Sequence, residues 1–314
     1  MTEDTKNVYA GSLSIRKRRP FLVDLAVRFV KEKPLGTVGA IIVILFLFVG
    51  IFANWLAPYN YNAAFVGGKL EAPSTTFWFG TDNVGRDLLS RIIYGARISM
   101  FVGLGISALA TVISTIIGTI SGFIGGTFDI VMQRFVDAWV CFPGMFVMLT
   151  FLAIVGAGVA QLILVLGIQG GIGGSRLARS AVMAIKSNAY VDAAKAIGCP
   201  TAAILIRHIL PNIMAPLIIM FTMGLGGAIL AESSISFLGY GIPPPAPTWG
   251  GMLSGNARRY MIQAPWMAIF PGLALSIVVY GANMFGDALR DLLDPRLRGG
   301  LGRYSSSPVK RRSL

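Results

Sequence analysis

Five stretches of this chain contain no Asp, Glu, Lys or Arg, and each is long enough to cross a lipid bilayer as a helix. They cover residues 34–68, 98–128, 138–175, 209–231 and 260–286. A bilayer core about 30 Å thick needs about 20 consecutive apolar residues in helical conformation. The sequence therefore predicts an all-α integral membrane protein.

The composition excludes most other classes of protein. Charged residues make up 13% of the 314 residues and hydrophobic residues 54%, whereas soluble domains carry about 25% charged residues. A soluble enzyme, an exported binding protein and a disordered chain are therefore excluded. The net charge of +13 does not indicate nucleic-acid binding, because the basic residues lie at the chain ends and between the apolar stretches, beside membrane lipid. One histidine and two separated cysteines predict no metal site.

The charge-free stretch 138–175 is about twice as long as one membrane span. Gly156 and Gly158 near its middle indicate a tight turn, so it is interpreted as two helices. We therefore predict a transmembrane domain over residues 36–292 with six spans, at about 36–57, 98–124, 138–157, 160–178, 209–231 and 264–286. In residues 1–35, the amphipathic segment 21–34 predicts a helix lying on the inner leaflet. Residues 293–314 form a basic tail.

The distribution of Lys and Arg predicts the orientation. With the N-terminus inside, the cytoplasmic segments hold 21 of the 27 basic residues. Because basic residues are enriched in cytoplasmic loops, both termini are expected in the cytoplasm of a prokaryotic cell whose plasma or inner membrane the chain crosses several times.

Small residues predict one helix contact. Gly118, Gly122 and Gly126 recur every fourth residue, a spacing that lets two helix backbones approach closely in lipid. Few ionisable residues fall within the spans, which argues against a proton or sodium relay. Glu232 is expected at the membrane interface, near the end of the fifth span.

The cytoplasmic loop 180–212 carries the most functional information. Residues near 191–196 are compatible with a short helix, and Gly198, Cys199 and Pro200 interrupt it. Thr201 is expected to cap a second short helix that leads into the fifth span. Helices this short are marginal alone, so the apolar residues of this bracket are expected to need a partner surface.

This loop resembles the EAA loop of binding-protein-dependent ABC importers. The resemblance lies in Asp192-Ala193-Ala194, then Gly198, then His208-Ile209-Leu210-Pro211. It implies that Asp192, Ala193, Ala194, Gly198, His208, Leu210 and Pro211 belong to a coupling loop that docks on an ATP-binding subunit. Aspartate replaces the family's usual glutamate, and histidine stands where the general pattern has isoleucine.

Three further blocks resemble the C-type permease subunit of dipeptide and oligopeptide importers. They are FGTDNVGRDLLSRIIYGARIS (79–99), LAESSISFLGYGIPPPAPTWGGML (230–253) and GDALRDLLDPRLR (286–298). The resemblance covers about residues 20–300. It implies the type I ABC importer permease fold and four kinds of partner: a homologous B-type permease, two ATP-binding subunits, an external substrate-binding protein, and membrane lipid.

Charged residues before the second span are candidates for the outer face. Asp82 or Asp87 can cap that helix. Arg86, Asp87 and Arg91, together with Trp249 in the proline-rich external loop, are expected either to dock the binding protein or to form the outer gate. Intrachain ion pairing and capping is the alternative for the charged residues, and anchoring at the membrane interface is the alternative for Trp249.

The chain contains no phosphate-binding loop and no assignable nucleophile–base pair, so it is expected to be a non-catalytic subunit. No cofactor is expected on this chain, while ATP and Mg are expected on the partner subunits. Hydroxyls such as Ser233, Ser234 and Ser236 are candidates for weak contacts with the cargo. Other cargoes (nickel chelates, glutathione, oligosaccharides or antimicrobial peptides) remain open, and a secondary transporter is the alternative from another class.

Overall fold

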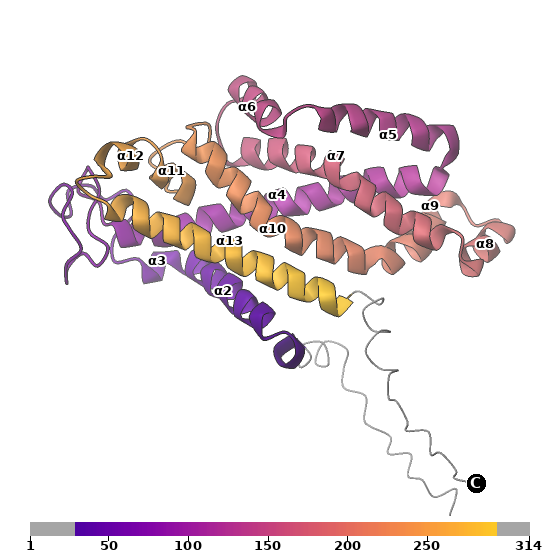
Figure 1. Ribbon diagram of the computed structural model, residues 1–314, viewed down its shortest axis with the longest axis horizontal. Coiled ribbons are helices and arrows are strands. Elements are labelled where there is room, and N and C mark those ends of the chain that lie inside the picture. Colours follow the sequence, from indigo (N-terminus) through magenta and orange to yellow (C-terminus); the bar gives the residue numbers. More distant parts are fainter. Residues whose placement is uncertain (1–28, 294–314) are drawn as a thin grey trace, which may run out of the picture.

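The computed structural model describes residues 29–293, so most of the helix predicted at 21–34 and the basic tail beyond residue 293 lie outside it. Within these residues the regular secondary structure is helical, apart from one isolated bridge between Thr81 and Asp87, and residues 57–87 and 238–248 form the longest non-helical segments. The helices form an elongated bundle (Figure 1). They are α2 (Pro34–Ile51), α3 (Ala53–Leu56), α4 (Leu88–Ile124), α5 (Gly126–Cys141), α6 (Gly144–Val155), α7 (Val159–Lys186), α8 (Ala189–Ala196), α9 (Thr201–Ile204), α10 (Met214–Phe237), α11 (Trp249–Leu253), α12 (Asn256–Tyr260) and α13 (Trp266–Leu293).

Four helical runs in the described part are long and apolar enough to cross a membrane individually. They are α2, α4, the run Thr201–Phe237 that contains α10, and α13. The bent pair α5 and α6 makes a fifth if the two count as one span. Helix α7 is 28 residues long, but it includes two glutamines, several glycines and three basic residues. Length and composition therefore support four to five spans.

The third predicted span is the clearest correction. Instead of one helix over 138–157, α5 and α6 meet at an angle of 85°. The break lies at Phe142 and Pro143, where Phe142 is extended. A proline disfavours the helical conformation in the residue before it and has no N–H to continue the ladder. The turn predicted after this segment is present, because α6 ends at Val155 and Gly156 has a φ of +93°.

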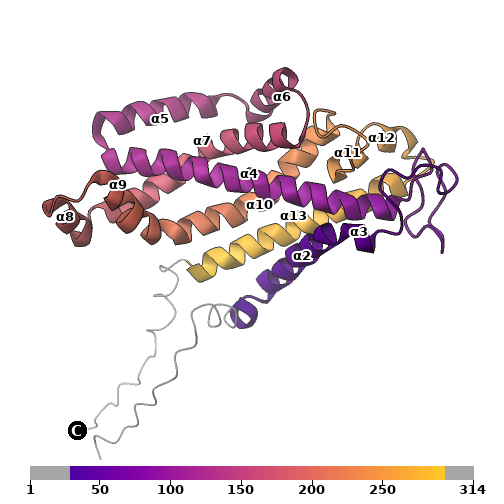
Figure 2. The same ribbon diagram turned by 180° about the vertical axis from the view of Figure 1, so that it is seen from behind.

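Helix α4 begins at Leu88, earlier than the predicted start of the second span at residue 98. Asp87 is the N-cap residue, and its carboxylate accepts a 2.8 Å hydrogen bond from the Ser90 backbone N–H. A side chain of this kind satisfies one of the free N–H groups at a helix start. The capping predicted for Asp82 or Asp87 is thus performed by Asp87, and α4 runs along most of the bundle (Figure 2).

Helices α4 and α7 pack closely side by side in parallel. A Cβ atom at Gly118 would lie 2.5 Å from the Ser175 carbonyl oxygen, and one at Gly122 would lie 3.0 Å from that of Arg179. The two glycines therefore allow the backbone contact that their spacing predicts. Gly126 does not join it, because a Cβ there would meet nothing within 4 Å.

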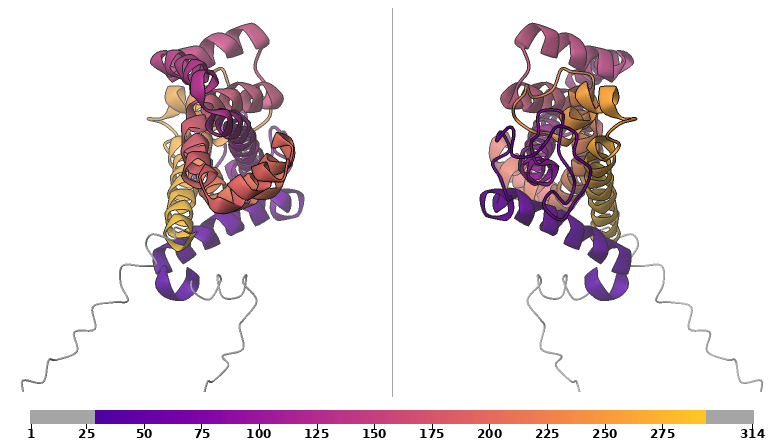
Figure 3. Two further views of the ribbon diagram at one scale, coloured as in Figure 1. Left: turned by 90° about the vertical axis from the view of Figure 1, so that its right-hand side faces the viewer. Right: turned by 90° about the vertical axis from the view of Figure 1, so that its left-hand side faces the viewer.

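The bundle has its largest buried cluster between α2, α4, α10, α11 and α13. Helices α5 and α6 lie along one edge of the bundle and α2 along the opposite edge (Figure 3). Large apolar side chains also point outward, and on α13 they form a stripe with helical spacing: Ile269, Leu273, Ile277 and Tyr280. Such an apolar exterior suits a lipid environment rather than water.

Candidate functional site

The loop after α7 folds into the bracket that its glycine and proline residues predict. Helix α8 ends at Ala196, and Gly198 adopts a φ of +79°. This left-handed conformation costs glycine little and is common just after a helix end. Pro200 is the N-cap residue of α9. Thr201 was predicted to be this cap, but it is the first residue of α9, and no side chain caps the helix.

The second half of the bracket continues into the membrane run without a sharp break. A π-helical turn spans Leu205–Ile209 and a 3-10 turn spans Leu210–Ile213, followed by α10. Pro211 explains this irregular ladder, because it cannot donate a backbone hydrogen bond to the preceding turn. Within this irregular segment, the Asn212 side-chain amide donates a 2.6 Å hydrogen bond to the His208 carbonyl oxygen.

One face of the bracket is buried against the bundle. Val191 and Ala194 of α8 belong to the same cluster as Ile204 and Ile209 from the segment leading into α10. The cluster also includes one residue near the end of α4 and two from α7, which are Phe123, Ala178 and Val182. The bracket is therefore packed onto the ends of three long helices.

The opposite face of the bracket is open. Among the predicted coupling residues, Asp192, Ala193, Gly198 and Pro211 are exposed, His208 and Leu210 are half-buried, and Ala194 is buried. Three apolar side chains that were not singled out are also exposed: Tyr190, Ile197 (79%) and Ile206 (64%). The available signal was the presence of large apolar residues in a loop between membrane segments.

A charged cluster links the helices next to the bracket. The Asp129 carboxylate of α5 accepts two hydrogen bonds from the Arg179 guanidinium of α7 and one from the Ser121 hydroxyl of α4. Such a bidentate pair fixes geometry as well as charge. On α8, Lys195 lies 3.1 Å from the Asp192 carboxylate. The structure thus ties α4, α5 and α7 together at the end of the bundle that holds the bracket.

The opposite end of the bundle holds the residues proposed for docking or gating (Figure 1). Arg86 pairs with Asp82 at 2.6 Å, and Arg91 lies 3.8 Å from the same carboxylate. Arg91 also donates a hydrogen bond to the Tyr61 carbonyl oxygen. Arg91 and Asp87 are buried and Arg86 is half-buried. These contacts correspond to the intrachain alternative, and they leave Asp87 and Arg91 little surface for a docking protein.

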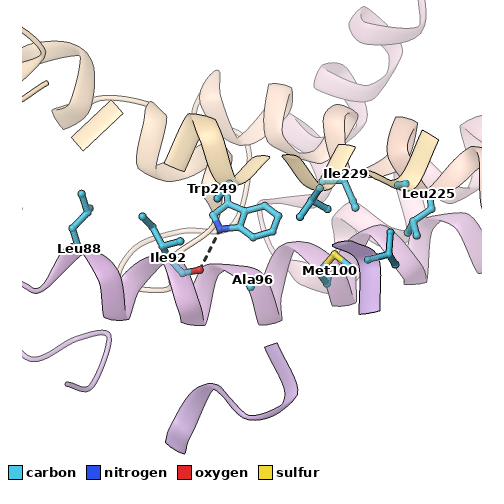
Figure 4. Packing of buried hydrophobic residues seen from close by; sticks show 11 residues of the cluster. Leu88, Ile92, Ala96, Met100, Leu225, Ile229 and Trp249 are labelled. Carbon is cyan, nitrogen blue, oxygen red and sulfur yellow. Dashed lines mark hydrogen bonds between the residues drawn. The ribbon is translucent and has the colours of Figure 1, made fainter. Parts of the chain in front are cut away.

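Trp249 is a core residue and not a membrane-interface anchor. Its side chain is fully buried, and Nε1 donates a 3.2 Å hydrogen bond to the Ile92 carbonyl oxygen (Figure 4). Phe46 packs edge-on against the indole with ring centroids 5.5 Å apart. The indole therefore fixes α11 and the proline-rich loop before it to α2 and α4, and it has no exposed surface for a partner.

Glu232 lies near the end of α10, and its side chain is buried within the chain. Its carboxylate accepts hydrogen bonds from Ser236 at 2.7 Å and from Ser233 at 3.2 Å. The Ser234 hydroxyl donates to the Leu230 carbonyl oxygen within the helix. The three hydroxyls predicted to contact cargo are thus engaged within the chain.

Comparison with known proteins agrees with this architecture. Residues 114–299 match the family described as binding-protein-dependent transport system inner membrane component. Residues 22–73 match the N-terminal transmembrane domain of oligopeptide transport permease C.

Two relatives align over most of their length. A glutathione transport system permease protein of Escherichia coli O157:H7 is 38% identical over 270 residues, which cover 86% of this chain and 89% of the relative. A dipeptide transport system permease protein of Alkalihalophilus pseudofirmus is 38% identical over 273 residues, which cover 87% and 90%. The chain therefore belongs to the family of inner membrane permease components of binding-protein-dependent ABC transport systems.

Proposed function

We propose that this permease carries short peptides into the cytoplasm as the C-type subunit of its importer. The support is that the named cargoes of its relatives, dipeptides and glutathione, are both short chains of amino acids joined by amide bonds. We propose the remaining subunits from the family: a homologous B-type permease, two ATP-binding subunits that hold ATP and Mg, and an external binding protein.

The cargo proposal is tested by uptake into proteoliposomes that contain the complete complex. We expect ATP-dependent uptake of labelled dialanine, trialanine or glutathione when the binding protein is present. Uptake of a nickel chelate or an oligosaccharide with none of these peptides would reject the peptide cargo. The same preparation without this chain is the control.

We further propose six membrane crossings with both termini in the cytoplasm. Helices α4 and α7 pack in parallel, as the contacts of Gly118 and Gly122 with residues near 175–182 support. Two parallel neighbours need an intervening segment that returns across the bundle, and the bent pair α5–α6 fills that role. In this arrangement α7 is the fourth crossing, and its two glutamines, Gln161 and Gln169, are half-buried against other parts of the chain.

The proposed coupling site is the bracket formed by α8, α9 and the π-helical turn Leu205–Ile209 that follows α9. The observation that carries this proposal is its two apolar faces: one packs on α4, α7 and the start of α10, and the other exposes Ile197 and Ile206. Exposed apolar residues outside the membrane are costly in water, so a partner surface is expected there. A closely packed bracket moves as a unit, because packed interfaces shift between discrete arrangements. Closure of the ATP-binding subunits would therefore displace three long helices together.

Matched substitutions test this coupling site. We expect Ile197→Glu and Ile206→Glu to insert normally into the membrane but to lose co-purification of the ATP-binding subunits and peptide uptake. Ile262→Glu is the control, because Ile262 is 96% exposed at the other end of the bundle. Normal assembly and uptake by both bracket variants would contradict the proposed contact.

A further inference from the structure

A cavity of about 240 Å³ lies between α4, α6, α7 and α10. Its lining is made of small, hydroxyl-bearing and apolar residues and one amide side chain, Gln169, and none of them is ionisable. An apolar cavity of about 150 Å³ is known to hold a molecule of benzene. This cavity is larger and therefore has room for a segment about the size of one amino-acid residue.

Glycines keep this cavity open for a reason other than close packing within the chain. A Cβ at Gly227 of α10 would meet nothing within 4 Å, and a Cβ at Gly224 would lie 3.6 Å from the Ser107 hydroxyl, an ordinary contact. At Gly118, by contrast, a Cβ would collide with the backbone of α7. Glycine inside a helix is disfavoured relative to alanine. At Gly224 and Gly227 this cost is not offset by a close helix contact, and what the glycines preserve is space.

Two buried polar atoms belonging to the cavity lining have no hydrogen-bond partner among the described residues. They are the Ser107 hydroxyl, on a residue that is 3% exposed, and the Oε1 atom of Gln169. The hydroxyl of Ser114, another lining residue, does have a partner, because it donates a 2.8 Å hydrogen bond to the Gly171 carbonyl oxygen. Unpaired buried polar groups are costly and rare. Neither atom is open to the cavity in the present rotamers, so the Ser107 and Gln169 side chains must rotate to reach a group that enters it, and neither has to give up a hydrogen bond of that atom to do so.

The chemistry of the two atoms selects an amide. The Gln169 Oε1 atom accepts a hydrogen bond, and the Ser107 hydroxyl can donate one. A peptide group supplies the complementary N–H and C=O, whereas a lipid acyl chain supplies neither. A charged amine or carboxylate would be unpaired in a cavity with no ionisable lining.

We propose that this cavity is a transient subsite for an uncharged backbone segment of the peptide cargo, with Gln169 and Ser107 hydrogen-bonded to its amide. The proposal rests on the proposed peptide import and specifies where the passing chain is held. Because Gly224 and Gly227 are exposed on α10, the cavity opens at the surface of this subunit, as entry from a pathway shared with a second permease requires.

The test compares transport and stability in the complete reconstituted complex. Ser107→Ala and Gln169→Leu remove the unpartnered polar atoms. We expect each to lower peptide uptake about three- to tenfold, the loss of one neutral hydrogen bond, while the thermal unfolding temperature stays equal or rises. The control Ser114→Ala removes a satisfied hydrogen bond and should lower that temperature. A fall in unfolding temperature for both Ser107→Ala and Gln169→Leu would assign these groups to structure and overturn the proposal.

A cargo analogue tests amide recognition directly. Uptake of trialanine is compared with uptake of its analogue methylated on the central amide nitrogen. The same binding protein is used with every variant, so that the preference of the binding protein cancels. We expect the wild-type complex to favour trialanine more strongly than the Gln169→Leu complex does. Equal preference in both complexes would reject the subsite while leaving peptide import intact. Failure of the wild-type complex to transport any peptide would reject the proposed cargo and the subsite with it.

The last variant identifies the occupant. Gly227→Leu fills the cavity without an intrachain collision at Cβ. We expect the complex to assemble, the loaded binding protein to stimulate ATP hydrolysis, and peptide uptake to be blocked. Dissociation of the two permease subunits would instead show that the cavity receives a partner side chain, and unchanged uptake would show that cargo does not enter it. Either result overturns the proposal.

Discussion

Replacing Trp249 by alanine should destabilise the outer end of the bundle strongly. The indole is fully buried in the largest apolar cluster, and its Nε1 atom is bonded to the Ile92 carbonyl oxygen. Truncation of a buried tryptophan to alanine costs about 3–5 kcal/mol, because the lost contacts leave a cavity. Trp249→Phe keeps most of the ring and loses the hydrogen bond, which is worth about 1 kcal/mol. We therefore expect the order of damage to be Trp249→Ala, then Trp249→Phe.

Another tryptophan supplies the matched control. Trp78 is 69% exposed, so Trp78→Ala should change stability by less than about 0.5 kcal/mol. The measurement is thermal inactivation of the purified complex, scored by the fraction that stays monodisperse after heating. Because membrane complexes commonly unfold irreversibly, the comparison uses one heating protocol for all variants.

One result would refute the burial argument. If Trp249→Ala and Trp78→Ala inactivate at the same temperature while only Trp249→Ala loses binding-protein stimulation, the indole contributes to docking and not to the core. The docking role predicted from the sequence would then be reinstated. Equal stability with equal stimulation would also contradict the packing shown in Figure 4.

Three further changes have defined outcomes. In a cysteine-free background, Thr75→Cys should react with an impermeant reagent in intact cells and Asn188→Cys only after permeabilisation; the reverse pattern contradicts the proposed orientation. Gly198→Val should weaken coupling, measured as ATP hydrolysis stimulated by the loaded binding protein, because the left-handed backbone costs a branched residue about 1–2 kcal/mol, whereas Gly198→Asn should be nearly normal. Glu232→Ala should lower thermal stability by about 2–3 kcal/mol, since it leaves buried hydroxyls unpaired, and Glu232→Gln by clearly less; equal losses would mean that the hydrogen bonds contribute little.

The features that followed from the sequence are those fixed by local chemistry. Long charge-free stretches that cross a membrane must be helical, and Asp87 caps the helix that it precedes. Gly198 and Pro200 end the short helix before them, whatever the position of the loop in the fold. The break at Pro143 was equally local, but a charge-free stretch gave no reason to divide α5 from α6 there. The same proline signal that located the turn in the bracket would have located this one.

Burial could not be predicted from residue type in the outer segments. Arg86, Arg91 and Trp249 are residues that often mark binding surfaces, and they lie outside the charge-free stretches. The Asp82 carboxylate lies only four residues before Arg86, whereas Tyr61 and Ile92 contribute only backbone carbonyl oxygens to Arg91 and Trp249. The ion pair of Arg86 with Asp82 was therefore open to the intrachain alternative, whereas a backbone carbonyl partner leaves no trace in the sequence, and the burial of Trp249 could not be predicted from it.

A comparison of two glycines explains why the cavity could not be predicted from the sequence. Gly118 and Gly227 both lie inside long apolar helices, and only the first belongs to a four-residue glycine repeat. At Gly118 the missing side chain is replaced by the backbone of α7, whereas at Gly227 nothing takes its place. The same residue type therefore brings two helices together in one position and holds space open in another. Only the position of the neighbouring helix distinguishes the two uses, and that position depends on residues such as Ser175 and Ser107, which lie far from either glycine in the sequence.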